Sequence, residues 1–263
     1  MTSRLVGHGD PTAYLSFPSL TALGVPNATT TRHCPGVTSF AEPIVPQAPR
    51  PPFRAEASVV LGAAGLDLSR VSYARQVHGA DAASVPAAGG FAGLVDVLFT
   101  AERGVPLAIF TADCLAIVLY DPSARALAVA HVGWRGTVRG ATQAAVKAIA
   151  RLGGTAGSLR AAIAPSIGPC CYEVDGPVLE AMRERFGADV EEALRPARPG
   201  HARLDLPAVA ALALVAAGVE RAAIGAVAGC TRCDATRFHS FRRDGAAAGR
   251  LLSWVEVPRA RSA

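Results

Sequence analysis

The chain has 263 residues, of which 51% are hydrophobic and 18% are charged, a balance that excludes an intrinsically disordered protein and predicts a large buried core. The formal net charge is +5, but the basic residues are scattered and almost all are arginines, so no basic stripe indicates a nucleic-acid-binding protein. The longest apolar stretch, Ala208–Val219, is too short to cross a membrane, and the first residues carry no export signal, so we expect a cytoplasmic protein without a membrane partner.

The N-terminal quarter of the chain contains few strong signals for regular structure. Ala28–Thr31 has the composition of a short strand, and Ala55–Gly65 predicts a helix that ends at a glycine. Between them, residues 42–52 are so rich in proline that they can enter neither a helix nor a central strand. We expect this segment to be an exposed insertion within the domain.

The middle of the chain predicts strands that are buried on both faces. Val71–Val77 is expected to form a strand that leads into His78. Four closely spaced apolar runs follow, each too short for a helix and separated from the next by turn residues: Val95–Thr100, Pro106–Phe110, Leu115–Tyr120 and Ala126–Val132. Because these runs are apolar at successive positions, the sheet must be covered on both sides.

Helical and strand patterns are mixed in the C-terminal half of the chain. From Thr137 onward, apolar residues recur at helical spacing until Gly153 and Gly154 end the pattern. Helices are also predicted over Val178–Phe186 and Leu206–Ala217, and strands over Leu159–Ala164, Ile224–Ala228 and Leu251–Val257. Without regular alternation of strands and helices, this order favours an α+β fold with mixed sheets in a single domain, residues 1–263.

Three good metal ligands stand at the ends of apolar strands. They are His78 in RQVHGAD, Cys114 in TADCLAIVLYD and His131 in AHVGWRG. A lone histidine or cysteine in an apolar setting is usually only packed or hydrogen-bonded, but two imidazoles and one thiolate together match the three protein ligands of catalytic zinc. We therefore expect a metal site, and Asp113 could orient a ligand histidine or a water there.

The segment that follows His131 is rich in glycine and arginine. Its glycines allow sharp turns, and a helix beginning near Thr137 would direct N–H groups toward an anion, with Arg135 beside them, an arrangement that suits phosphate. Arg139 either joins this site or pairs with a surface carboxylate. Arg75 would project to the opposite face of a regular strand from His78, so it needs a turn in order to share the pocket.

Two groups of residues near the C-terminus keep alternative interpretations. Cys230 and Cys233 could form half of a structural zinc site, but the other close pair, Cys170–Cys171, lacks the Cys-x-x-Cys spacing. Arg242 and Arg243 could contact phosphate or form structural ion pairs. The sequence leaves both questions open.

The segments RQVHGAD, TADCLAIVLYD, HVGWRGTVRG, PSIGPCCYEV and FHSFRRDGAAAGR, in this order, resemble the YfiH-like family, also called the laccase-domain or polyphenol oxidase family. The resemblance runs from Val71 to the C-terminus. It implies a four-layer α/β/β/α sandwich with a zinc site at His78, Cys114 and His131. It also implies phosphorolysis of the purine nucleosides inosine, adenosine and methylthioadenosine, adenosine deaminase activity and copper-dependent oxidase activity.

We therefore predict a zinc-dependent purine nucleoside phosphorylase and adenosine deaminase whose small-molecule partners are purine nucleosides and phosphate. The predicted catalytic residues are Cys114, His131 and Asp113, and the predicted substrate-binding residues are Thr38, Arg75 and Arg135. Thr38 stands in a Pro-Gly-Val-Thr turn where the family usually has Gly-Gly-Val-Ser. The alternatives are a peptidoglycan-editing factor that acts on a misincorporated amino acid in cell-wall precursors and a copper-dependent polyphenol oxidase. The sequence does not indicate the oligomeric state.

A true laccase with several copper centres would need more imidazole ligands than the 6 histidines of this chain can supply. A copper electron carrier with a His2Cys site usually adds an axial methionine, and the chain has only Met1 and Met182. A zinc-binding module without catalysis is the remaining possibility, favoured if the pocket is closed to solvent.

Overall fold

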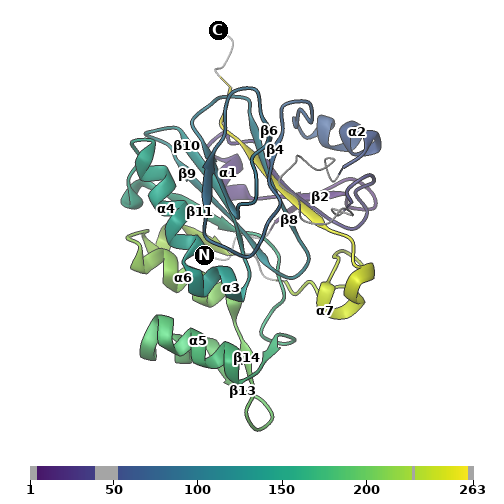
Figure 1. Cartoon of the computed structure of the whole chain (residues 1–263). Coiled ribbons are helices and arrows are strands. Elements are labelled where there is room, and N and C mark those ends of the chain that lie inside the picture. Colours follow the sequence, from purple (N-terminus) through teal and green to yellow (C-terminus); the bar gives the residue numbers. More distant parts are fainter. Residues whose placement is uncertain (1–4, 39–52, 227–228, 260–263) are drawn as a thin grey trace.

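The computed structural model describes residues 5–38, 53–226 and 229–259 (Figure 1). The proline-rich segment 42–52 lies outside the described residues, although Val37 and Phe53, on either side of this gap, pair in an isolated antiparallel bridge. In the described part of the chain, no helix is both long enough and apolar enough to span a bilayer.

Two large mixed sheets and one small sheet are formed by the described residues. The first sheet has seven strands, in the order β1 (Val6–His8), β2 (Tyr14–Ser16), β3 (Asn27–Thr30), β16 (Leu251–Glu256), β8 (Pro106–Thr111), β4 (Ser72–Tyr73) and β6 (Gly90–Phe91). The second has six, in the order β15 (Ile224–Ala226), β11 (Arg160–Ile163), β9 (Leu115–Asp121), β10 (Ala126–Val132), β7 (Val97–Thr100) and β5 (Ala82–Ser84). The small sheet contains β12 (Glu173–Val174), β14 (Ala202–Leu204) and β13 (Leu194–Pro196).

The α-helices of the described residues are mostly short. They are α1 (Pro18–Thr21), α2 (Ala55–Ala63), α3 (Trp134–Arg139), α4 (Ala141–Arg151), α5 (Gly176–Phe186), α6 (Leu206–Ala216) and α7 (Phe241–Asp244). The periodic segment that we expected to begin near Thr137 starts three residues earlier, at Trp134, and consists of two helices. Gly140 separates them because its φ of 87° lies in the left-handed region that glycine adopts without strain.

The two large sheets pack face to face, and the alternation of side chains along each strand supplies three core layers. On β9, Leu115, Ile117 and Leu119 face the helices, whereas Ala116, Val118 and Tyr120 face the other sheet. On β8, Leu107 and Ile109 enter the space between the sheets, and Ala108 and Phe110 face outward. Strands covered on both faces need apolar residues at every position, which is why their sequences are uninterrupted apolar runs.

Helices cover the outer faces of both large sheets. Residues of α3, α4, α5 and α6 bury the outer face of the six-stranded sheet, and Ala57 and Leu61 of α2 pack on the outer face of the seven-stranded sheet beside Trp254. In Figure 1, α4 and α6 lie on one side of the strands and α2 on the other. The predicted four-layer α/β/β/α arrangement with mixed sheets is confirmed.

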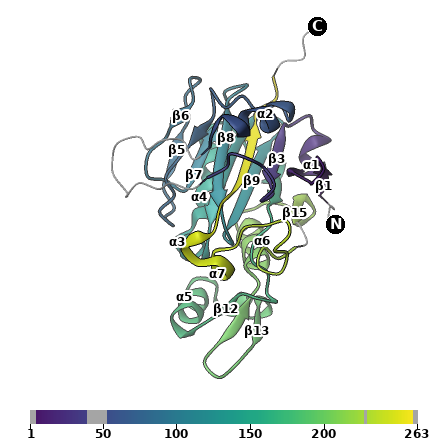
Figure 2. The same cartoon turned by 90° about the vertical axis from the view of Figure 1, so that its right-hand side faces the viewer.

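Several short elements escaped the sequence prediction, among them β5, β6 and the three strands of the small sheet. The strand expected over Val71–Val77 is wrong in length, because β4 ends at Tyr73. Figure 2 shows α3, α7 and α5 at one end of the large sheets, next to the small sheet. The candidate site lies at this end.

Candidate metal centre

Three elements bring His78, Cys114 and His131 together. His131 is the penultimate residue of β10, and Cys114 immediately precedes β9. The antiparallel register pairs Val132 with Leu115, so the end of β10 lies beside the start of β9 and therefore beside Cys114. His78 arrives from the loop that follows β4 in the other sheet. The six-stranded sheet thus positions Cys114 and His131, and the seven-stranded sheet positions His78.

The three side chains have the spacing of a metal site. Their ligand atoms all lie within 4.8 Å of one another. Cys114 Sγ is 3.9 Å from His78 Nε2, and the two imidazole rings are nearly perpendicular, at 78°, with centroids 4.8 Å apart. Two ligands at tetrahedral positions on zinc, with Zn–S and Zn–N bonds of about 2.3 and 2.0 Å, would be about 3.5 Å apart. The described side chains therefore fit a small thiophilic cation such as zinc.

Asp96 holds two of these side chains in place. Its buried carboxylate accepts a hydrogen bond from His131 Nδ1 (2.8 Å), which leaves Nε2 of this ring for the site. The same carboxylate accepts the backbone N–H groups of Val77 (3.1 Å), His78 (3.0 Å) and Gly79 (2.7 Å). Burial alone would raise the pKa of Asp96, but these hydrogen bonds and the charge of His131 lower it.

Sequence reasoning missed Asp96 and considered Asp113 for orienting a ligand histidine or a water. The carboxylate that meets His131 is Asp96, and a role of Asp113 toward a water stays a prediction. The signal was present: Asp96 is the charged residue inside the otherwise apolar run Val95–Thr100. A buried carboxylate in such a run needs hydrogen-bond donors.

The loop that carries His78 replaces the last part of the expected strand. The side-chain amide of Gln76 donates to the carbonyl of Phe110 (2.6 Å) and accepts its N–H (2.9 Å), as a neighbouring strand would do. The N–H groups of the next residues point to Asp96 instead of to β8. His78 itself has a φ of 59°, and Arg139 donates to its carbonyl (2.8 Å). Arg139 thus supports the ligand loop, and no carboxylate among the described residues forms an ion pair with it.

Gly133 provides the space that the site needs. A Cβ atom at this position would lie 2.7 Å from Cys114 Sγ and 3.2 Å from Cδ2 of His78. Its φ is ordinary for any residue, so the requirement is the close approach of the two ligands and not the backbone conformation. This explains one glycine of the segment that follows His131.

Interactions among the three side chains shift the pKa values of Cys114 and His131 even without a cation. Burial alone would raise the pKa of the Cys114 thiol, but the charge and hydrogen bonds of His131 and His78 lower it to about 6. Burial would likewise lower the pKa of His131, yet the Cys114 thiolate and Asp96 raise it to about 9. A thiolate is the form that binds metal, so Cys114 is already prepared as a ligand near neutral pH.

A cavity of about 570 Å³ opens beside these residues. Its described lining combines the three ligands with arginines and aromatic rings: Arg75, Arg135, Arg242 and Arg250, and Phe110, Trp134, Tyr172 and Phe241. Asp113 is the single carboxylate in that described lining. The cavity therefore has a cationic wall, flat apolar surfaces and a metal-binding corner.

The other predicted residues occupy different positions around the cavity. Asp113 lines it, and its carboxylate accepts hydrogen bonds from the hydroxyls of Thr231 (2.6 Å) and Ser240 (3.1 Å) and from the N–H of Arg242 (2.6 Å). Arg135 is exposed in the first turn of α3, with its guanidinium 4.5 Å from the centre of the Trp134 ring.

Arg75 lines the cavity because the loop after β4 departs from the strand before reaching it, and its part in substrate binding stays a prediction. Thr38 does not contribute to the cavity lining formed by the described residues. Its part in substrate binding stays a prediction.

The two arginines of the FRRDG segment have different roles. Arg242 reaches the cavity, where its guanidinium lies over the Tyr172 ring at 5.1 Å and donates to the carbonyl of Glu173 (2.9 Å). Arg243 pairs with Asp244 and donates to the carbonyls of Thr231 and Phe238. Arg243 is thus structural, and Arg242 remains available to a ligand.

Comparison with known proteins finds a matching family and named relatives. Residues 54–258 match the family described as multi-copper polyphenol oxidoreductase laccase. The chain is 38% identical over 194 residues to the purine nucleoside phosphorylase YlmD of Geobacillus stearothermophilus, covering 73% of this chain and 68% of that protein. It is 40% identical over 161 residues to the adenosine deaminase RL5 of an unknown prokaryotic organism, covering 61% of this chain and 62%, less than two thirds, of that protein.

Solved structures agree over a longer stretch. The crystal structure of YlmD from Geobacillus stearothermophilus superposes with a TM-score of 0.83 at 30% identity, covering 97% of this chain and 100% of that one. A hypothetical protein YfiH from Bacillus licheniformis gives a TM-score of 0.82 at 27% identity, covering 93% and 96%.

Proposed function

The chain belongs to the multi-copper polyphenol oxidoreductase laccase family, and from that premise we propose that it is a zinc-dependent purine nucleoside phosphorylase that also deaminates adenosine. Relatives named for these two activities support an enzyme that acts on nucleosides. The proposed substrates are inosine, adenosine and methylthioadenosine, with phosphate as the second substrate of phosphorolysis.

The observation that carries the proposal is the composition of the cavity wall. Four arginines and four aromatic rings face the same space as the His78, Cys114 and His131 cluster. Guanidinium groups bind phosphate through paired N–H donors, and aromatic rings stack on the flat face of a purine. A nucleoside and a phosphate ion need both kinds of surface in one cavity.

For phosphorolysis, the arginines supply binding and charge stabilisation. The N-glycosidic bond breaks through a transition state with positive charge on the ribose, so a phosphate held against that sugar both attacks its C1′ carbon and stabilises the charge. Arg135 can hold this phosphate because it is an exposed arginine that lines the cavity. Arg75 and Arg242 line the same cavity and can share the anion.

For deamination, the ligand cluster and Asp113 supply the chemistry. When bound at His78, Cys114 and His131, zinc supplies Lewis acidity for the attack of water on the base. Asp113 is the carboxylate in the described lining, and we propose that it moves a proton at the base. This reaction consumes water and releases ammonia, and it needs no phosphate.

The copper alternative has less support from the ligand set. A blue-copper centre usually adds a weak axial methionine to two histidines and one cysteine. Met182 lies fully buried in the core under the helices and is not part of the described cavity lining. We therefore propose zinc as the metal of this site.

The test compares two reactions in one variant. In Arg135→Lys, the lysine keeps a positive charge but loses the paired donors, so the KM for phosphate in hypoxanthine release from inosine should rise about tenfold. The KM for inosine and the deamination of adenosine should change much less. Arg183→Lys, at an exposed ion pair with Glu191 outside the described lining, is the matched control.

Two outcomes would contradict the proposal. Equal losses of both activities in Arg135→Lys would remove the phosphate role of Arg135. Absence of both activities in the wild-type protein, together with turnover of a muramyl-peptide precursor, would favour the peptidoglycan-editing alternative.

A further inference from the structure

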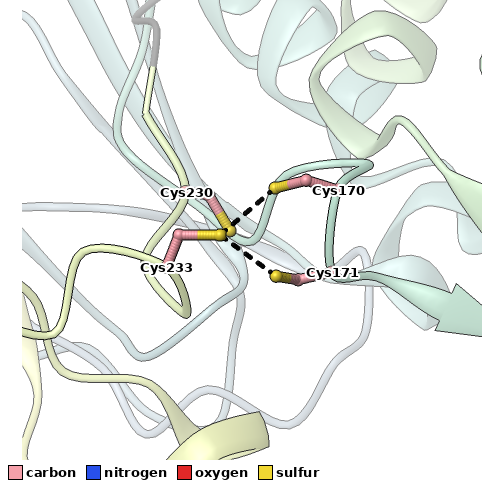
Figure 3. Close-up of side chains that lie close together, drawn as sticks. All are labelled: Cys170, Cys171, Cys230 and Cys233. Carbon is pink, nitrogen blue, oxygen red and sulfur yellow. Dashed lines mark hydrogen bonds between the residues drawn. The ribbon is translucent and has the colours of Figure 1, made fainter.

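Four cysteines from two distant segments meet outside the cavity. Cys170 and Cys171 lie in the loop between β11 and β12, and Cys230 and Cys233 follow β15. The strands β11 and β15 are parallel neighbours, so their C-terminal ends lie side by side at the same end of the sheet. Ser166 and Cys230 continue this pairing as an isolated parallel bridge. Figure 3 shows the four side chains pointing toward one another.

The sulfur atoms have the spacing of a four-ligand metal site. All four Sγ atoms lie within 4.8 Å of one another, with 3.5 Å between Cys170 and Cys233 and 3.2 Å between Cys171 and Cys233. Sulfurs at the corners of a tetrahedron around zinc, with bonds of about 2.3 Å, are about 3.8 Å apart. We propose that Cys170, Cys171, Cys230 and Cys233 bind a structural zinc ion, separate from the metal centre in the cavity.

The backbone around Cys230 supports this assignment. The N–H of Gly168 donates to Cys230 Sγ at 3.2 Å, which stabilises a thiolate. A Cβ atom at Gly168 would lie 3.2 Å from Cys230 Cβ and 3.5 Å from Cys170 Sγ, so a larger residue would press on the cluster. Glycine at this position lets the loop that carries Cys170 approach Cys230 closely.

The charge balance also favours a dication. Four thiolates on one zinc ion carry a net charge of −2, and the positive charge of Arg232, between Cys230 and Cys233 in the sequence, offsets part of it.

Such a zinc ion would join two segments that build the cavity. Ile167 and Tyr172, on either side of the first cysteine pair, line the cavity. Thr231, between the cysteines of the second pair, donates to Asp113 at 2.6 Å. The proposed role is structural: all four positions are occupied by cysteine, which leaves no site for a substrate.

Zinc content tests the proposal independently of the reaction. Protein purified under reducing conditions should contain two equivalents of zinc per chain. Cys233→Ser and Cys171→Ser should each reduce this to one, Cys114→Ala should also leave one, and the double variant Cys114→Ala/Cys233→Ser should leave none. Cys34→Ser is the matched control, because Cys34 is a buried cysteine outside both clusters, and it should retain two.

Cobalt provides a second measurement that does not require a cysteine-to-serine change in the cluster. Co²⁺ added to metal-free Cys114→Ala protein should produce the intense charge-transfer absorption of a tetrathiolate site. Absence of this absorption, unchanged zinc content in both Cys233→Ser and Cys171→Ser, or a Cys171–Cys233 disulfide in freshly purified protein would each overturn the proposal. Failure of the nucleoside assays would leave it unaffected, since its readouts do not involve turnover.

Discussion

Replacing Asp96 by asparagine would separate metal binding from general stability. The buried carboxylate accepts four N–H donors, with His131 and His78 on Oδ1 and Val77 and Gly79 on Oδ2. Asparagine has a similar shape but offers only one acceptor oxygen, so two of the four donors would face an NH₂ group. At about 1.5–3 kcal/mol for each hydrogen bond to a charged group, the free energy of unfolding should fall by about 3–6 kcal/mol.

The same substitution should weaken metal binding. Asp96 selects the tautomer of His131 and holds the backbone of His78, and loss of such an outer hydrogen bond typically lowers metal affinity by about 10–100-fold. Urea denaturation of metal-free protein would measure the first effect, and competition with a chromophoric zinc chelator would measure the second. The zinc measurement would be made in Cys233→Ser protein, so that a single site is titrated.

Asp121 offers a matched control. Its buried carboxylate also accepts four hydrogen bonds, from Ser123, Ala124, Thr155 and Ser158, but it lies at the other end of β9, about 20 Å from Cys114 along the strand. Asp121→Asn should destabilise the fold to a similar extent and leave zinc affinity unchanged. If both variants lost zinc affinity equally, or if Asp96→Asn kept it, the orienting role of Asp96 would be refuted.

Three further predictions rest on individual contacts. Gly133→Ala should lose the zinc of the cavity site in elemental analysis, because the new Cβ would lie 2.7 Å from Cys114 Sγ. Gly157→Ala is the control and should retain this zinc, because no atom lies within 4 Å of its Cβ position. Gln76→Ala should lower the urea midpoint by removing both hydrogen bonds to Phe110, at a cost of about 1–3 kcal/mol. The pKa values of Asp96 and Asp121 in the folded protein lie below their usual 3.8. The two carboxylates therefore stabilise the fold fully above pH 3.8, and this stabilisation is lost as the pH falls through the lower folded pKa values. Urea midpoints measured from pH 6 downward should decline least in the Asp96→Asn/Asp121→Asn double variant.

The central strands and the three cavity ligands could be predicted because local sequence carries their signal. β8, β9 and β10 are buried on both faces, so their apolar runs match the observed strands to within a residue. Cys114 and His131 were recognisable because ligand-type side chains stand out at the ends of such runs. His78 was grouped with them on the same ground, and the resemblance to a family implied the same three ligands. Only the four-layer arrangement came from that resemblance, because periodicity does not supply it.

The remaining features depend on contacts between segments far apart in the sequence. The strand before His78 ends early because the Gln76 side chain takes the place of a backbone partner on β8, which no local pattern records. The two- and three-residue strands are too short to establish a period, so their pairing with neighbours alone defines them. The Arg242 and Arg243 side chains differ in role only because Tyr172 lies beside one and Asp244 beside the other.

The sequence by itself determined the classes of side chain available to this protein: apolar strands for a core, two histidines and a cysteine for a metal, and arginines for an anion. The tertiary structure alone decided which of them meet. Asp96 became the partner of His131 because β7 and β10 pair antiparallel with Val97 opposite Ala130, and four cysteines converge because β11 and β15 are parallel neighbours. Such encounters depend on the direction and register of strands about 30 to 60 residues apart, which is information that residue type and spacing do not contain.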